Sequence, residues 1–313
     1  MAAPAARLPR VLSVAVLVNL VVQVGIVITG GWVRLTGSGL GCPTWPECVP
    51  GSFTPVTEQE EGLRAAIEFG NRLLTFVVAL AAVAVVVLLW RHRRRLLGYG
   101  LAVLLGTVAQ AVIGGFTVLL GLHPATVAVH FLVSAGLIAV SAALVLRVRE
   151  PDGPGQRLLP RPLRALLAGL VVTGAATLVL GTVVTGSGPH SGDAEVPIRF
   201  DLDFAAVSVL HAEAVVLFVG LLLGLLAGLH AVSAPRRLLG RTWLLLGVTL
   251  AQGGVGWLQY FTGLPRALVS LHMLGACLLV VALVAVVLAT RERGPRTPDL
   301  APRRSTAGEL VGS

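Results

Sequence analysis

The chain has little charge and no lysine. Only 12% of its 313 residues are charged and 55% are hydrophobic, whereas a water-soluble domain carries about 25% charged residues. The mean hydropathy is +0.87. This balance excludes a soluble enzyme, a disordered chain and a collagen-like chain, and it predicts a polytopic membrane protein.

The positive charge comes entirely from arginine. All 24 basic residues are Arg, the formal net charge is +9, and most of these residues lie in short clusters between apolar runs. Such clusters are typical of the connections that set membrane topology, so no nucleic-acid partner is needed to explain them. The three cysteines are too few for a disulfide framework.

Eight apolar runs are long enough to cross a lipid bilayer, for which a helix needs about 20 residues. We therefore expect an all-α fold with eight transmembrane helices. The first run is longer than the apolar region of a signal peptide and has no clear cleavage site, so we interpret it as a retained helix. The predicted spans are 11–33, 67–90, 97–120, 124–146, 164–186, 205–231, 242–262 and 267–290.

The distribution of arginine predicts the orientation in the cell membrane. Nineteen arginines lie in the two termini and in the connections on the same side, and five lie on the opposite side. Connections rich in arginine stay in the cytoplasm, so we expect both termini there. Residues 291–313 are rich in Pro and Arg, which predicts a disordered cytoplasmic tail.

The two halves of the chain resemble each other. Residues 25–30 are echoed by residues 181–186, and residues 104–137 match a segment 142 positions further on without a gap. Each half has an even number of spans, so both halves insert in the same direction. We predict two four-helix bundles, at 11–146 and 164–290, related by an axis along the membrane normal.

Three histidines share one depth inside the predicted spans. His130, His211 and His272 each lie about six residues from the outer end of a span, which is about 9 Å of helix rise. A titratable residue inside a membrane is costly and is a candidate for function. Two imidazoles on facing helices commonly hold a haem iron, as we expect for His211 and His272. Zinc is the alternative, although it needs three or four ligands.

The equivalent pair in the first half is broken. A shift of 140 positions aligns Asn71 with His211, and an amide is a poor ligand for haem iron. His130 is then the main protein ligand expected in this half, and the other axial face is more open. Glu68 falls on the same helical face as Asn71. Its carboxylate either works in this site or only stabilises the start of the helix.

Longer motifs surround these residues: GGWVRLTGSGLGCPTWPEC at 30–48, IEFGNRL at 67–73 and GPHSGD at 188–193. With the histidines inside the spans, they make residues 11–290 resemble the haem A synthase family, whose members oxidise the C8 methyl group of haem O to a formyl group. The resemblance implies an oxidoreductase acting on a CH or CH2 group, which supplies haem A for terminal oxidase biogenesis. It also implies haem O synthase and a membrane or quinol electron donor as partners.

The resemblance assigns roles to the candidate residues. It implies haem b as cofactor, with His211 and His272 as axial ligands of its iron. It places the substrate, haem O, in the N-terminal bundle, with His130 on its iron and Glu68 as the catalytic residue. The chain departs from the family at Asn71, where His is more common, so ligation of haem O by two histidines is not expected.

Charged and sulfur-containing residues at the outer surface complete the candidates. Arg34 and Arg72 suit pairing with haem propionates. Cys42 and Cys48 lie in the first outer loop, away from the reducing cytosol, and we expect a disulfide between them; free thiols with a transient redox role are the alternative.

Two other functions compete with haem oxidation. One is a two-haem membrane cytochrome that only transfers electrons, for example from quinol; the missing ligand at Asn71 counts against it. The other is a porphyrin carrier, which has no use for a carboxylate at Glu68. Association into a homo-oligomer is left open by the sequence.

Overall fold

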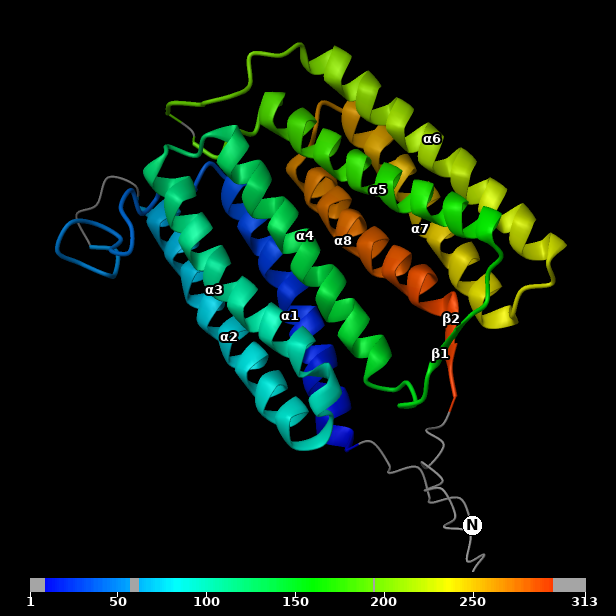
Figure 1. Cartoon of the computed structure of the whole chain (residues 1–313). Coiled ribbons are helices and arrows are strands. Elements are labelled where there is room, and N and C mark those ends of the chain that lie inside the picture. The colour runs from blue at the N-terminus through cyan, green and yellow to red at the C-terminus, as the bar shows by residue number, and fades with distance from the viewer. Residues whose placement is uncertain (1–8, 57–61, 194, 295–313) are drawn as a thin grey trace, which may run out of the picture.

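The computed structural model describes residues 9–56, 62–193 and 195–294. Within them lie eight long α-helices, one short 3-10 helix and two short strands (Figure 1). The elements are α1 (Arg10–Leu35), α2 (Leu63–His92), η1 (Arg94–Leu96), α3 (Leu97–Leu119), α4 (Pro124–Arg147), β1 (Gly155–Arg157), α5 (Arg161–Ser187), α6 (Phe204–Ala231), α7 (Arg236–Phe261), α8 (Arg266–Ala289) and β2 (Arg291–Arg293).

The all-α membrane fold predicted from the sequence is confirmed. Each of the eight predicted spans coincides with one helix, although α2, α5 and α7 begin several residues earlier because the helical backbone continues through polar turns. Seven of the helices in the described residues are long and apolar enough to cross a membrane. The exception is α7, which has 26 residues but begins with RRLLGR and carries Gly, Thr and Gln further on. It packs against α6 and α8.

The helices form two groups that lie side by side (Figure 1). In the first group, α1–α4, each helix packs against both of its neighbours; α1 and α4 also contact α8, and α4 contacts α5. Buried polar pairs tie α1 to this group: Asn19 Nδ2 donates to Ser141 Oγ at 3.1 Å and Gln23 Nε2 donates to Thr107 Oγ1 at 3.1 Å. Interhelical hydrogen bonds of this kind stabilise helix association in lipid, where the hydrophobic effect adds little.

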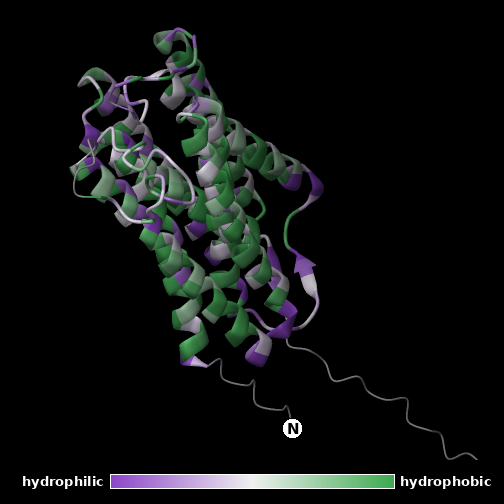
Figure 2. Ribbon diagram, turned by 90° about the vertical axis from the view of Figure 1, so that its left-hand side faces the viewer, coloured by the Kyte–Doolittle hydropathy of each residue, from purple (hydrophilic) through white to green (hydrophobic). Residues whose placement is uncertain are grey.

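The connections separate by charge between the two ends of the molecule, and Figure 2 shows hydrophilic residues gathered there. At one end, called here the Arg-rich end, Arg93 pairs with Asp152 at 3.1 Å. At the other, called the disulfide end, Cys42 and Cys48 form the expected disulfide. Gly39 N donates there to Gly192 O at 2.9 Å, joining loops of the two halves at this end.

The segment after α8 differs from the disordered tail that the sequence predicts. Arg291–Arg293 form β2, which pairs antiparallel with β1. The short linker between the two halves offers β1 as a strand edge, and composition alone does not reveal such a pairing. The remainder of the predicted tail, 295–313, lies outside the described residues.

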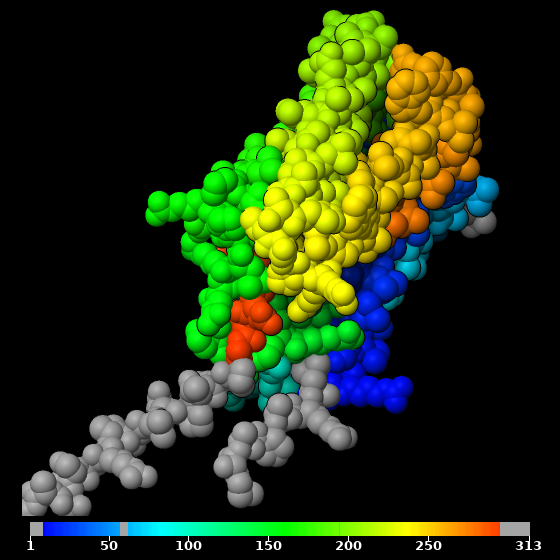
Figure 3. Space-filling model, turned by 90° about the vertical axis from the view of Figure 1, so that its right-hand side faces the viewer, coloured from blue at the N-terminus to red at the C-terminus, as the bar shows by residue number. Residues whose placement is uncertain are grey.

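The second helix group is well packed only in its Arg-rich half. In α6 every buried residue lies at or after Phe218, in α7 at or before Thr249, and in α8 at or after Cys277. Helices α5 and α6 pack closely, as do α7 and α8, but α5 barely touches α8. The space-filling view shows a hollow at the disulfide end between α6 and the turn that joins α7 to α8 (Figure 3).

Candidate functional site

The three candidate histidines lie at matching positions on their helices. His130 is the seventh residue of α4 and His272 is the seventh residue of α8. His211 is the eighth residue of α6. All three helices begin at the disulfide end, so the equal depth that the sequence predicts is present in the structure.

Each imidazole ring lies against a glycine of a neighbouring helix. A Cβ atom placed on Gly114 of α3 would lie 3.3 Å from His130 Cε1, and one placed on Gly256 of α7 would lie 3.1 Å from His272 Cε1. The ring of His211 has the same relation to Gly181 of α5, at 3.3 Å. Any larger side chain at these glycines would push the rings away, so the glycines fix how the rings enter the bundles.

A glutamine one turn before each of two of these glycines repeats the arrangement. Gln110 Nε2 donates to the backbone carbonyl of His130 at 2.8 Å, and Gln252 Nε2 donates to that of His272 at 2.8 Å. Both residues of the second pair stand 142 positions after those of the first. The repeat found in the sequence is therefore a repeat of side-chain geometry around two histidines.

The histidine rings leave polar atoms without partners. The Nδ1 atoms of His130, His211 and His272 are buried and have no hydrogen-bond partner in the described part of the chain. His211 on α6 and His272 on α8 both belong to the second helix group and lie at the same depth in it. Unpaired buried polar atoms are costly and need an explanation.

These features fit haem as the occupant of the second helix group. Two imidazoles whose buried Nδ1 atoms have no partner, in a half of the group that contains few buried side chains, are what a haem needs. No group of three or more His, Cys, Asp or Glu side chains in the described residues is placed to hold a metal ion.

Asn71 turns toward α1. Its Oδ1 accepts a hydrogen bond from Thr29 Oγ1 at 2.7 Å, and its Nδ2 lies beside Gly30. Gly25, which corresponds to Gly181 beside His211, has nothing within 4 Å of a Cβ placed on it. The first group therefore has space on α1 where the second group holds a histidine ring.

Glu68 is buried in a polar network that holds the disulfide loop against α2. Its Oε2 accepts the backbone N–H of Cys42 at 2.7 Å, and its Oε1 accepts from Arg72 Nη2 at 2.6 Å and from Nε at 3.1 Å. Arg72 also donates to the carbonyl oxygens of Cys42, Thr44 and Glu47. Both candidates thus lie together at the disulfide end, and Arg72 already has four acceptors.

The disulfide loop covers the site of His130. Trp45 packs against α3 at Gly115, where a Cβ would lie 2.5 Å from Trp45 Cδ2. The preceding residue, Gly114, is the one that contacts His130. The sequence does not predict the contact of Trp45 with α3. The repeated small residues of α3 were its only signal.

The loops of the two halves at the disulfide end contact each other through Arg34. Arg34 Nε donates to the carbonyl of His190 at 2.6 Å and its Nη2 donates to that of Thr185 at 2.9 Å. His190 Nε2 lies 3.0 Å from Leu264 O. Arg34 belongs to the first group and its acceptors to the second, so this predicted substrate-binding residue lies between the two sites.

The fold and the site define a polytopic α-helical membrane protein with two related histidine sites. A family model named COX15-CtaA and described as cytochrome oxidase assembly protein matches residues 13–191, more than half of the chain. The chain belongs to this family, that of the haem A synthases. Its members bind haem, and membership makes the chain an oxidoreductase of haem A biosynthesis.

Individual relatives carry the same name. The chain is 38% identical over 125 residues to the haem A synthase of Lysinibacillus sphaericus, a match that covers 39% of either chain. It is 25% identical over 285 residues to the haem A synthases of Bacillus cereus and Bacillus anthracis, which covers 86% of this chain and 90% of theirs.

Proposed function

We propose that the chain oxidises the C8 methyl group of haem O to the formyl group of haem A. The observation that carries this proposal is the asymmetry of two otherwise equivalent sites. Both have a glutamine bonded to the histidine carbonyl and a glycine against the ring. The second site has two histidines, whereas the first has Asn71 in place of one. A haem iron that two histidines of the protein bind suits a cofactor that stays in the protein. A haem iron bound by only one histidine suits a substrate that must leave after the reaction.

In this proposal, the C-terminal bundle at 164–290 holds haem b between His211 and His272. A haem iron with two histidine ligands passes single electrons and has no position for another ligand. Gly181 and Gly256 set the ring positions, and Gln252 restrains the backbone at His272. The loosely packed half of the bundle supplies the space.

The N-terminal bundle at 11–146 receives haem O, with His130 on its iron and Asn71 on the opposite side. Conversion of a methyl to a formyl group, –CH3 + 2 O2 + 4 e⁻ + 4 H⁺ → –CHO + 3 H2O, takes two steps in which dioxygen would be the oxidant and the membrane or quinol donor would supply the electrons. Each step consumes protons, and Glu68 is the carboxylate that would relay them. Its ion pair with Arg72 and its bond from Cys42 N hold the carboxylate in place at the covered end of the bundle.

Arg34 and Arg72 are the proposed partners of the haem propionates. Both now donate to backbone carbonyl groups of the outer loops. A charged carboxylate accepts a stronger hydrogen bond than a neutral carbonyl, so a propionate can replace one of these acceptors without moving the guanidinium far.

The same proposal includes the orientation of the protein in the membrane, its partners and its oligomeric state. The Arg-rich end faces the cytoplasm of a bacterial cell, by the distribution of arginine. The partners are the enzyme that makes haem O and a membrane-bound or quinol electron donor. A homo-oligomer is compatible with the broad apolar surface that faces lipid.

Expression of the full chain with a source of haem O, followed by chromatography of the extracted haems, tests the proposal. Haem A or its alcohol intermediate supports it. Haem O recovered unchanged, together with a haem b spectrum that a quinol reduces, would favour the electron-transfer cytochrome instead.

A further inference from the structure

A basic cavity lies at the Arg-rich end, away from the histidine sites. Its volume is about 410 Å³, and it is lined by the end of α4, β1, the start of α5, the end of α8 and β2. The lining residues are Arg147, Arg157, Arg164, Leu167, Val287, Leu288, Thr290 and Arg291. Four of these eight residues are arginines, and none is acidic.

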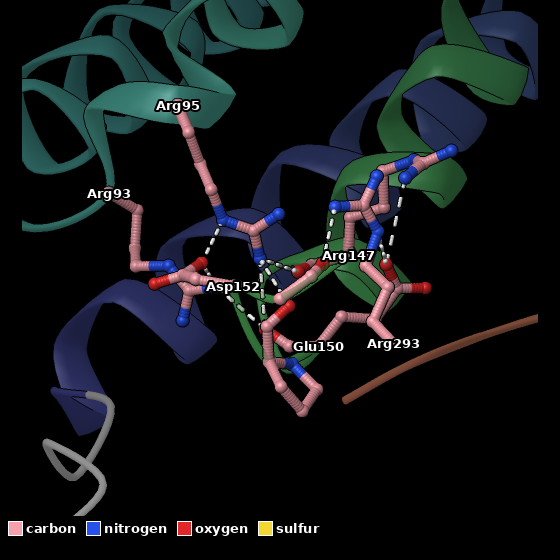
Figure 4. A network of polar contacts seen from close by, with 8 residues as sticks. Arg93, Arg95, Arg147, Glu150, Asp152 and Arg293 are labelled. Carbon is pink, nitrogen blue, oxygen red and sulfur yellow. Dashed lines mark hydrogen bonds and ion pairs between the residues drawn. The ribbon is translucent and has the colours of Figure 1, made fainter. Parts of the chain in front are cut away.

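The nearby carboxylates do not neutralise this cavity. Asp152 is bound by Arg93 and Arg95, and Glu150 lies 3.6 Å from both Arg147 Nη1 and Arg293 Nε (Figure 4). These two acids therefore face four arginines of their own, of which only Arg147 lines the cavity. The other three lining arginines have no carboxylate partner among the described ion pairs.

The backbone forces two of the lining arginines together. Arg157 of β1 and Arg291 of β2 are directly opposite each other in the antiparallel ladder. Like charges at such a position destabilise a strand pair unless something lies between them. Side chains alternate along a strand, so Glu292 points to the other face of the ladder and does not screen them.

The cavity also contains donors without acceptors. Arg147 Nε and Arg164 Nε are buried and have no hydrogen-bond partner in the described residues. Buried hydrogen-bond donors normally have an acceptor. A guanidinium group binds phosphate oxygens through two parallel hydrogen bonds, in a bidentate geometry. An anion with several oxygens would supply acceptors for these donors.

The depth of the cavity identifies the kind of anion. Arg147 ends α4, Arg161 begins α5 and Ala289 ends α8, so the arginines lie at the level of the lipid headgroups. Leu167 lies one turn beyond Arg164, and Val287 and Leu288 extend the apolar wall toward the membrane. Basic pockets between helix ends bind lipid headgroups in this manner. We propose that the cavity binds the phosphate headgroup of an anionic phospholipid, with an acyl chain along Leu167 and Leu288.

Lipid titration of the purified full chain in detergent, followed by native mass spectrometry, tests this site. The probes are cardiolipin, phosphatidylglycerol, phosphatidylcholine and inorganic phosphate. The double variant Arg164→Gln/Arg291→Gln should bind the two anionic lipids roughly 10- to 30-fold more weakly than the unaltered chain. The matched variant Arg236→Gln/Arg237→Gln removes two charges from the start of α7, at the same end but outside the cavity, and should change binding less than twofold.

A second variant separates the lipid from free phosphate and does not remove charge. Leu288→Trp places a larger side chain in the space beside the apolar wall and leaves all four arginines of the cavity unchanged. It should weaken anionic lipid binding while leaving any binding of inorganic phosphate unchanged. Haem content of each variant reports folding, because no substituted residue contacts the histidine sites.

Two results would overturn the proposal. If both double variants weaken lipid binding equally, lipid affinity depends only on the overall charge of this end of the protein. Lipid binding unaffected by Leu288→Trp, with inorganic phosphate displacing the lipid, would assign the cavity to a free phosphate.

Discussion

Glu68 and Arg72 lie one turn apart on α2 and form an ion pair, with 2.6 Å between Oε1 and Nη2. A buried carboxylate is costly unless it is paired and hydrogen-bonded, and Glu68 is both. The pair anchors the disulfide loop, and through the loop it positions Trp45 over the site of His130. Structural and chemical roles of Glu68 therefore have to be separated by experiment.

Glu68→Gln should lower haem A formation by about 10²- to 10⁴-fold, the range for loss of a proton-transfer group, and leave the haem b spectrum intact. The amide keeps the shape of the side chain but cannot hold a proton. Extracted haems are measured by chromatography. Glu47→Gln is the control, because Glu47 lies in the same loop and its carboxylate accepts from Gly51 N rather than from Cys42 N or Arg72.

Arg72→Gln distinguishes the two roles of Glu68. This change breaks the ion pair and loosens the loop but keeps the carboxylate. Because Arg72 is also a proposed partner of the haem propionates, haem O binding is measured in the same variants. Equal loss of haem A formation in Arg72→Gln and Glu68→Gln, with haem O binding unchanged in both, would show that loop anchoring alone is required, and would contradict a catalytic Glu68.

His211→Ala and His272→Ala should each convert a low-spin, six-coordinate haem b spectrum to a high-spin one, or abolish it. Each change removes one of the two imidazoles that meet in the second helix group. His230→Ala is the matched control, since His230 bonds to Leu226 O near the Arg-rich end. Absorption spectra of the purified variants measure the spin state of the haem b iron. Unchanged spectra in both variants would refute the ligand assignment.

Asn71→His should add a second ligand to the haem in the first group. Gly25 leaves the space that the new ring needs, as Gly181 does for His211. We expect tighter haem O binding and slower product release, together with loss of binding in His130→Ala. Haem O titrations measure both effects, with Asn71→Gln as a control that keeps the amide. Identical affinities in all variants would remove residue 71 from the substrate site.

Replacement of Cys42 and Cys48 by serine should lower the free energy of unfolding by about 2 kcal/mol, because the bridge closes a short loop. The freed loop should also withdraw Trp45 from Gly115 and reduce haem A formation. Thermal unfolding and haem extraction measure the two effects. Cys277→Ser in α8 leaves the loop untouched and serves as the control. Free Cys42 and Cys48 thiols in freshly trapped membranes would contradict the bridge.

Single cysteines can test the orientation, since Cys42 and Cys48 are bridged and Cys277 is buried. Glu195→Cys lies exposed at the disulfide end and Gln156→Cys at the Arg-rich end. In intact cells an impermeant maleimide should label the first and spare the second until the membrane is opened. The reverse pattern would place the Arg-rich end outside.

The sequence predicted the helices well because crossing a membrane imposes length and apolarity on each of them. It also predicted the equal depth of His130 and His272, since a gapless repeat preserves depth, and that of His211 from its distance to the outer end of its own span. These features depend on local composition and on spacing within one half of the chain.

The contacts that complete the sites were not predictable in the same way. Trp45 reaches Gly115 across about 70 residues of sequence only because Glu68 and Arg72 hold the intervening loop. Arg34 finds acceptors at Thr185 and His190 in the other half. Such contacts depend on how loops pack in three dimensions, and no periodicity or spacing reports them. The pairing of β1 with β2 is hidden for the same reason.

That pairing has a consequence for the order of biogenesis. β1 lies between the two halves and β2 follows the last helix, so the ladder cannot close until the ribosome has delivered every membrane segment. Arg291 enters the basic cavity at the same moment. Closure of β1 on β2 is therefore a final step of insertion, one that fixes the linker between the two halves only after both are in place.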